Sequence, residues 1–188
     1  MKTQFDIEKV LEAGKLQTEL EYERALIADR KLRVLSKENY RLKPLRKKLR
    51  DLIEQYENKN WSSDSKISGT QLEESDLAEL IAEKERAFIK RRKELIKKEL
   101  KRHSLNQQDL GELLGHTSKT YMSELMNGIS PFTLKDLIII NRVLKIVLSD
   151  LVPTTLSQNQ RARIKKSIAK IGSEKIKLSK DDFDLVLL

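Results

Sequence analysis

Residues that interrupt helices are few in this chain and stand far apart. Its 188 residues include six glycines and three prolines, and the long stretches between them are rich in Leu, Lys, Glu, Arg and Ala. These residue types favour helix, and no turn dipeptide separates two alternating segments in the manner of a β-hairpin. The sequence therefore predicts an all-α protein.

Composition limits both the core and the class of partner. Charged residues make up 36% of the chain, whereas aromatic residues supply only 5%, so we expect a small aliphatic core. The net charge of +9 favours a polyanionic partner, most often nucleic acid. No apolar run approaches the roughly 18 residues of a membrane span, and the N-terminus has no apolar leader segment. We therefore expect a cytoplasmic protein that does not enter membranes.

The distribution of helical patterns and of polar, helix-breaking residues indicates four parts of the chain. Residues 1–61 carry three helical patterns and form an N-terminal helical segment. Residues 62–74 are rich in serine and other polar residues and are typical of a linker. Residues 75–155 are expected to hold a basic helix, with Ser75 as its N-cap, followed by a compact helical domain. Residues 156–188 form a short C-terminal tail.

Two segments outside the compact domain are strongly basic. The lower half of the helix predicted before His103 carries ten lysines and arginines against three glutamates, and this charge fits either a solvated face or contact with phosphate. In the tail, basic residues flank Ile164, Ile168 and Ile171, which predicts an amphipathic helix that ends at Gly172. Residues 175–178 alternate like one short strand, and the last residues are apolar.

The most informative stretch lies between residues 105 and 128. Asn106 is placed to cap a short helix that Gly115 ends, and Ser118 is placed to cap a second short helix, Lys119 to Asn127, that Gly128 ends. Two short helices joined by a tight glycine-containing turn form a helix-turn-helix, in which the second helix presents its N-terminal polar residues to the major groove.

This stretch resembles the lambda-repressor/Cro-type (XRE) family of helix-turn-helix domains. Residues 105–115, Leu-Asn-Gln-Gln-Asp-Leu-Gly-Glu-Leu-Leu-Gly, resemble the second helix and turn of that family, and residues 121–128 resemble its recognition helix. Residues 131–137 and 144–153 resemble the fourth and fifth helices. The resemblance implies a five-helix domain over residues 90–153. The turn after Gly115 is one residue longer than usual, and Gly111 stands where alanine is commoner.

The resemblance also implies which residues meet DNA and which meet a second subunit. A homodimer would place two recognition helices about 34 Å apart on a pseudo-palindromic duplex. The residues expected to contact DNA are polar and lie at the starts of the two helices or along the second: Gln107, Gln108, Thr117, Ser118, Lys119, Thr120, Ser123 and Asn127. For Asn127, capping of the helix is the alternative. An apolar excess marks the expected dimer interface: Ile138, Ile139, Ile140 and Leu144.

A second resemblance concerns the segment before the linker. Residues 49–61, Leu-Arg-Asp-Leu-Ile-Glu-Gln-Tyr-Glu-Asn-Lys-Asn-Trp, resemble the helical segment of HigA-type antitoxins. This implies an antitoxin that neutralises a HigB toxin, an mRNA interferase of the RelE superfamily, and represses its own operon. The residues expected to hold the toxin are large and mostly apolar: Leu49, Leu52, Ile53, Tyr56 and Trp61. The apolar residues 183–188 are the alternative toxin site, and both segments could instead complete the chain's own core.

Other functions remain open at this point. A phage or chromosomal repressor without a toxin fits the same domain, and a scaffold whose basic helices bind RNA fits the charge. An enzyme is not expected, because the two histidines, His103 and His116, lack metal-ligand spacing and no phosphate-binding loop is present. We expect neither cofactor nor metal.

Overall fold

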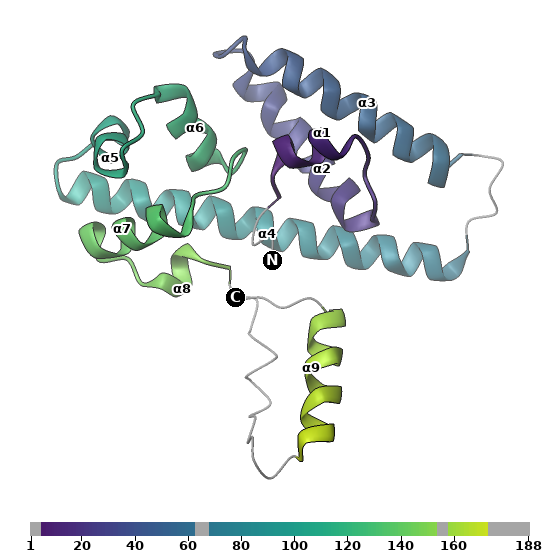
Figure 1. Ribbon diagram of the computed structural model, residues 1–188. Helices are drawn as coiled ribbons and strands as arrows, with labels where there is room; N and C mark the ends of the chain where they lie inside the picture. The colour runs from purple at the N-terminus through teal and green to yellow at the C-terminus, as the bar shows by residue number, and fades with distance from the viewer. Residues whose placement is uncertain (1–4, 63–67, 154–157, 173–188) are drawn as a thin grey trace. The chain divides into compact units, whose positions relative to one another are not determined.

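The computed structural model describes residues 5–62, 68–153 and 158–172, and within these ranges the chain is all-α, with no strand (Figure 1). The helices in chain order are α1 (Ile7–Ala13), α2 (Glu19–Leu35), α3 (Leu42–Asn60), α4 (Gly69–Arg102), α5 (Gln107–Leu114), α6 (Lys119–Asn127), α7 (Leu134–Leu144), α8 (Leu148–Leu151) and α9 (Gln158–Ile171). They belong to two compact units, Met1–Leu151 and Val152–Leu188.

The long helix α4 organises the first unit. Its N-terminal half packs against α2, which also packs against α3, and its C-terminal half contacts α5, α6, α7 and α8 (Figure 1). Ala78 and Ala82 are buried in the first half, and Ile96 and Leu100 in the second. One continuous helix therefore packs against both the N-terminal helices and the helix-turn-helix.

The apolar residues of α1, α2 and α3 form one core. Its fully buried members include Ile7, Leu32 and Leu49, and Ile129 enters the same core from the turn that follows α6. Tyr22 and Tyr56 stack beside it with their ring centroids 5.0 Å apart. Their hydroxyls donate to the carboxylates of Glu57 and Glu19, respectively, at 2.8 and 2.9 Å.

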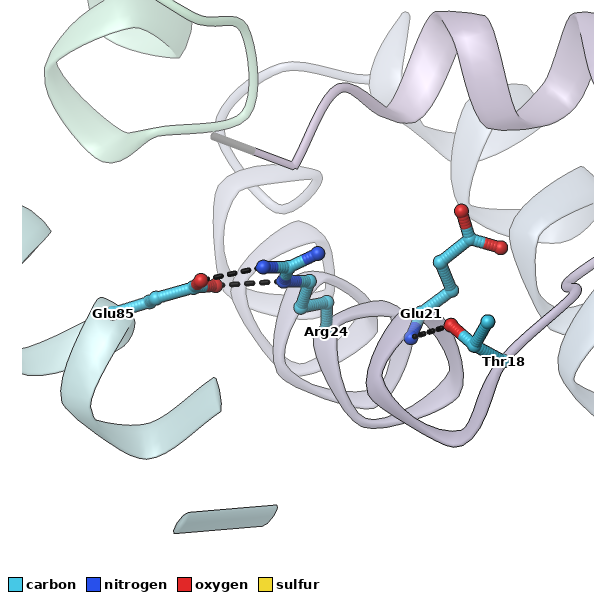
Figure 2. Close-up of polar contacts among 4 residues, drawn as sticks. All are labelled: Thr18, Glu21, Arg24 and Glu85. Atoms are coloured by element: carbon cyan, nitrogen blue, oxygen red, sulfur yellow. Dashed lines mark hydrogen bonds and ion pairs between the residues drawn. The ribbon is translucent and has the colours of Figure 1, made fainter. Parts of the chain in front are cut away.

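Two ion pairs join helices of this unit. Arg24 of α2 donates from Nε and Nη2 to the two carboxylate oxygens of Glu85 on α4, at 2.7 and 2.5 Å (Figure 2). Arg46 of α3 pairs in the same two-pronged way with Asp29 of α2. Figure 2 also shows the N-cap of α2, where the Thr18 hydroxyl accepts from the Glu21 backbone N–H. Two-pronged arginine–carboxylate pairs fix orientation as well as distance, so they set how α2 lies against its neighbours.

The start of α4 corrects the predicted linker. Ser68, not Ser75, caps the helix, accepting from the Gln71 N–H at 3.2 Å, so residues 69–74 are helical. The polar stretch is held by contacts with the first helices: Gln71 Nε2 donates to the Asn60 carbonyl, and Ser75 Oγ donates to Glu19. The residues predicted to form an N-terminal segment and those predicted to form the basic helix and helix-turn-helix lie in one compact unit, Met1–Leu151.

The tail agrees with the prediction where the structure describes it. Helix α9 begins at Gln158 and ends at Ile171, and Gly172 follows with a φ of 102°. The short strand predicted at 175–178 and the apolar residues 183–188 lie outside the described residues.

Candidate nucleic-acid interface

Helix α5 begins as the sequence predicts. The Asn106 side chain accepts from the backbone N–H groups of Gln108 and Asp109, at 2.7 and 3.2 Å, and the Asp109 carboxylate accepts from the Asn106 N–H at 2.6 Å. This reciprocal capping box satisfies backbone donors that a helix start leaves unpaired. Gly115 then ends α5 in the left-handed conformation, with a φ of 78°.

The turn between α5 and α6 passes very close to Gly111. The His116 N–H donates to the Gly111 carbonyl at 2.7 Å. A Cβ added at Gly111 would lie 2.7 Å from the His116 carbonyl oxygen and 3.1 Å from Cγ of Met122. Only glycine fits this position without a shift of the turn, which explains why the chain has no alanine there.

Helix α6 is also capped as predicted and is anchored from one side. The Ser118 hydroxyl accepts from the Tyr121 N–H at 3.2 Å, and Gly128 ends the helix with a φ of 69°. Met122, Leu125 and Met126 are buried beneath it. Among the polar residues of α6, Lys119 is exposed, whereas Thr120 and Ser123 are half-buried. The polar side chains of α6 are therefore most accessible to solvent at its first residue, Lys119.

The starts of α5 and α6 border one surface hollow of about 310 Å³. Its lining contains four of the residues predicted to contact DNA, namely Gln107, Gln108, Thr117 and Lys119, together with Asn106, His116 and Met122. We call this hollow the α5–α6 groove. The N-termini of two helices carry partial positive charge, so they make the groove favourable for anions.

His116 holds the turn in place from inside the groove. Its Nε2 lies 3.1 Å from Oδ1 of Asp136, which is buried and belongs to the capping box of α7. Its ring also meets the Tyr121 ring edge to face, with centroids 5.1 Å apart. The contact joins the start of α7 to the turn, so the longer turn is fixed by side chains.

The other predicted DNA contacts lie outside the groove lining. The Ser118 hydroxyl is engaged as the N-cap of α6. Thr120 and Ser123 are half-buried along α6. Asn127 is committed to the chain itself: its Nδ2 donates to the Ser123 carbonyl at 2.8 Å, and its Oδ1 accepts from Lys93 Nζ at 2.6 Å. These contacts hold Asn127 within the chain at the end of α6, in agreement with the alternative of a capping role.

Sequence reasoning missed the lysines that meet the end of α6. Lys31 of α2 donates to the Asn127 carbonyl at 3.2 Å, beside the contact that Lys93 makes. Cations at a helix C-terminus are favourable because the last carbonyls there are unpaired. Arg92 was missed as well: it is buried between the rings of Phe88 and Phe132 and donates to the Leu151 carbonyl at 3.2 Å. Its place within a run of basic residues gave no sign of burial.

The predicted dimer interface is wrong in half of its residues. Ile140 and Leu144 are 0% and 1% exposed and belong to the core, so neither can meet a second subunit. Ile138 is exposed and Ile139 is half-buried. Helix α7 packs on α4, α5 and α8, and a run of three consecutive residues spans more than half of a helix's circumference, so at least one of the three isoleucines faces inward.

The predicted toxin-binding surface is also corrected. Leu49, Leu52 and Ile53 are at most 8% exposed and fill the core between α1, α2 and α3. Tyr56 is half-buried in its stack with Tyr22, and Trp61 is half-buried at the end of α3. Leu49, Leu52, Ile53 and Tyr56 therefore contribute to the chain's own core, the outcome that the sequence left open as an alternative.

Two classes of site have no support among the residues that the structure describes. They contain no group of three or more His, Cys, Asp or Glu side chains placed to hold a metal ion. None of the described helices combines the length and the apolar character that crossing a membrane requires.

Comparison with known proteins does not assign a family or a function to the chain. No protein-family model, curated protein or solved structure is significantly similar to the chain. The function is therefore argued from the residues and their arrangement.

Proposed function

We propose that the protein binds duplex DNA sequence-specifically through the α5–α6 groove, as a helix-turn-helix transcriptional regulator of the XRE type. The observation that carries the proposal is the convergence of two capped helix starts on one groove lined by Gln107, Gln108, Thr117 and Lys119. The net charge of +9 supports a polyanionic partner.

The chemistry of the groove suits the edges of bases. A glutamine amide can donate to and accept from adenine, and a lysine ammonium can donate to O6 and N7 of guanine. Thr117 adds a hydroxyl that both donates and accepts. The partial positive charge at the two helix starts suits phosphate oxygens. Together these groups supply both positioning contacts and contacts that distinguish bases.

Selection from a random-sequence duplex library tests the proposal. The full chain should enrich a defined motif, and its affinity for that motif should exceed its affinity for a scrambled duplex. Lys119→Ala and Gln108→Ala should each reduce this preference by about 1–3 kcal/mol for a lost base contact. Lys47→Ala, an exposed lysine of α3, is the matched control and should leave the preference unchanged.

Two results would overturn the proposal. Failure to enrich any motif would remove specific recognition, and tighter binding to RNA than to every duplex would favour the RNA-binding scaffold. Circular dichroism of each variant ensures that lost preference is not lost folding.

The antitoxin function stays a prediction of the HigA resemblance. Most of the residues expected to hold a toxin are buried, so no described surface favours it over a repressor without a toxin. Co-expression with a RelE-like toxin encoded beside this chain would test it, since an antitoxin must restore growth.

A further inference from the structure

Five basic residues of α4 form a line on one side of the helix: Arg86, Lys90, Lys93, Lys97 and Lys101. At about 100° per residue they fall within an arc of about 80°, and at 1.5 Å per residue they span about 22 Å. We call this line the α4 stripe. Its regular spacing of three and four residues places every member on the same face.

Most of the charge on the stripe has no ion-pair partner among the residues that the structure describes. Arg86, Lys90, Lys97 and Lys101 are exposed and Lys93 is half-buried. Arg86 pairs with Glu83 at 2.7 Å, whereas Lys90, Lys97 and Lys101 form no ion pair with any residue that the structure describes. By contrast, Arg91, on another side of α4, pairs with Asp150 at 3.0 Å. Unpaired cations thus gather on the stripe.

Like charges crowd one another at the middle of the stripe. Burial, with the nearby cations Arg86, Lys93 and Arg92, lowers the pKa of Lys31 to about 8. Burial and the neighbouring Lys97 also lower the pKa of Lys93. Such crowding disfavours the folded chain in isolation, and a bound polyanion would relieve it.

The stripe adjoins the helix-turn-helix. Lys93 contacts Asn127 at the end of α6, and Asn127 in turn contacts Ser123 on the side of α6 that begins at Lys119. Lys101 lies at the end of α4, only a few residues before the start of α5. Helix α4, which carries the stripe, contacts both α5 and α6, the helices whose starts border the groove (Figure 1).

We infer that the α4 stripe binds backbone phosphates of the same duplex whose bases the α5–α6 groove reads, as a second contact that is independent of sequence. The inference rests on the proposed function. The exposed ammonium groups of Lys90, Lys97 and Lys101 are point charges of the kind that binds phosphate oxygens. A straight row of such charges beside a base-reading groove suits the sugar–phosphate backbone, along which charges recur regularly.

The salt dependence of DNA binding distinguishes phosphate contacts made by the α4 stripe from base contacts made by the α5–α6 groove. The test variant is Lys90→Gln with Lys97→Gln, because both side chains are exposed and unpaired within the described residues. Its binding to a mixed-sequence duplex should have a slope of log K against log salt that is smaller by about 1.8, at about 0.9 for each lost phosphate contact. Affinity for selected and scrambled duplexes should fall by the same factor.

Lys47→Gln with Lys48→Gln on α3 is the matched control, since it removes the same charge from two exposed lysines elsewhere. It should change the slope much less. Equal slopes for the two double variants would overturn the stripe as a duplex contact, even if the wild-type chain selects a motif. A stripe variant that loses affinity for single-stranded RNA and not for duplex would also overturn it. Absence of any selected motif would instead count against the proposed function.

Discussion

At the scale of single residues, Gly111 shows how one position fixes the geometry of the groove. Gly111→Ala should lower the free energy of unfolding by about 1–3 kcal/mol, because the added Cβ meets the His116 carbonyl, which belongs to the backbone and cannot turn away. The gain in helix propensity, at most about 1 kcal/mol, offsets only part of this. Urea denaturation followed by circular dichroism measures the change.

Gly69→Ala is the control, since a Cβ there meets nothing within 4 Å. It should be neutral or slightly stabilising. Equal effects of the two substitutions would show that the turn yields freely and that the close approach at Gly111 is unimportant.

Lys31 makes stability depend on pH in a defined direction. Its folded pKa is about 8, below the value of about 10.4 in an unfolded chain, so between these values only the unfolded state retains the proton. The stability that Lys31 contributes therefore rises as pH increases from 8 to 10. Relative to a Lys31→Met variant, the wild-type free energy of unfolding should gain up to about 2 kcal/mol over this range.

Arg86, Lys93, Arg92 and Glu83 are the charged groups that act on Lys31. Lys47→Met, at an exposed position of α3, controls for the loss of a lysine and should follow the wild-type curve. Parallel curves for wild type and Lys31→Met would contradict the burial of this ammonium group.

At the scale of elements, helix starts and ends that depend on local chemistry were predictable. Asn106, Ser118, Gly115 and Gly128 act where the sequence places them, because caps use side chains within a few residues. The start of α4 was missed because Ser68 resembles the surrounding polar residues, and the helix there is held by tertiary contacts such as Gln71 with Asn60. Such contacts leave no periodic signal in the sequence.

The ion pair between α2 and α4 should stabilise their packing more than a surface pair does. In a double-mutant cycle with Arg24→Met and Glu85→Met, we expect a coupling free energy of about 1–2 kcal/mol, because the pair is two-pronged and half-buried. Arg102 and Glu99, a pair within α4 whose arginine is exposed, should give about 0.3–0.5 kcal/mol. Equal coupling free energies in both cycles would contradict the claim that the Arg24–Glu85 pair stabilises the packing of α2 on α4 more than a surface pair does.

At the scale of the whole molecule, the sequence predicted the helical class but not how its parts join. The apolar faces of residues 1–61 were visible as periodic patterns, yet periodicity cannot tell which surface covers a face. In the structure the chain covers Leu49, Leu52 and Ile53 itself, and Ile129 reaches the same core from beyond α6. The four residues of the groove were predictable because the helix-turn-helix is local in sequence.

Truncation tests directly whether helices α1–α3 and the rest of the first unit depend on each other for stability. A chain that begins at Ser68 lacks α1, α2 and α3, which leaves Ala78, Ala82 and Ile129 without their cover. Its melting temperature should be lower by about 10 °C or more. A chain that ends at Pro153 retains the unit that closes at Leu151 and should melt as the full chain does. A fragment from Ser68 that melts like the full chain would restore the picture of independent domains.

The central claim is that the starts of α5 and α6 read the duplex, and amide chemical shifts measured during titration with the selected duplex test it most directly. The account predicts the largest shifts at Gln107, Gln108, Thr117 and Lys119, with smaller shifts along the α4 stripe and none in the middle of α3. Shifts confined to α9 or to α1–α3, with those four amides unchanged, would contradict it.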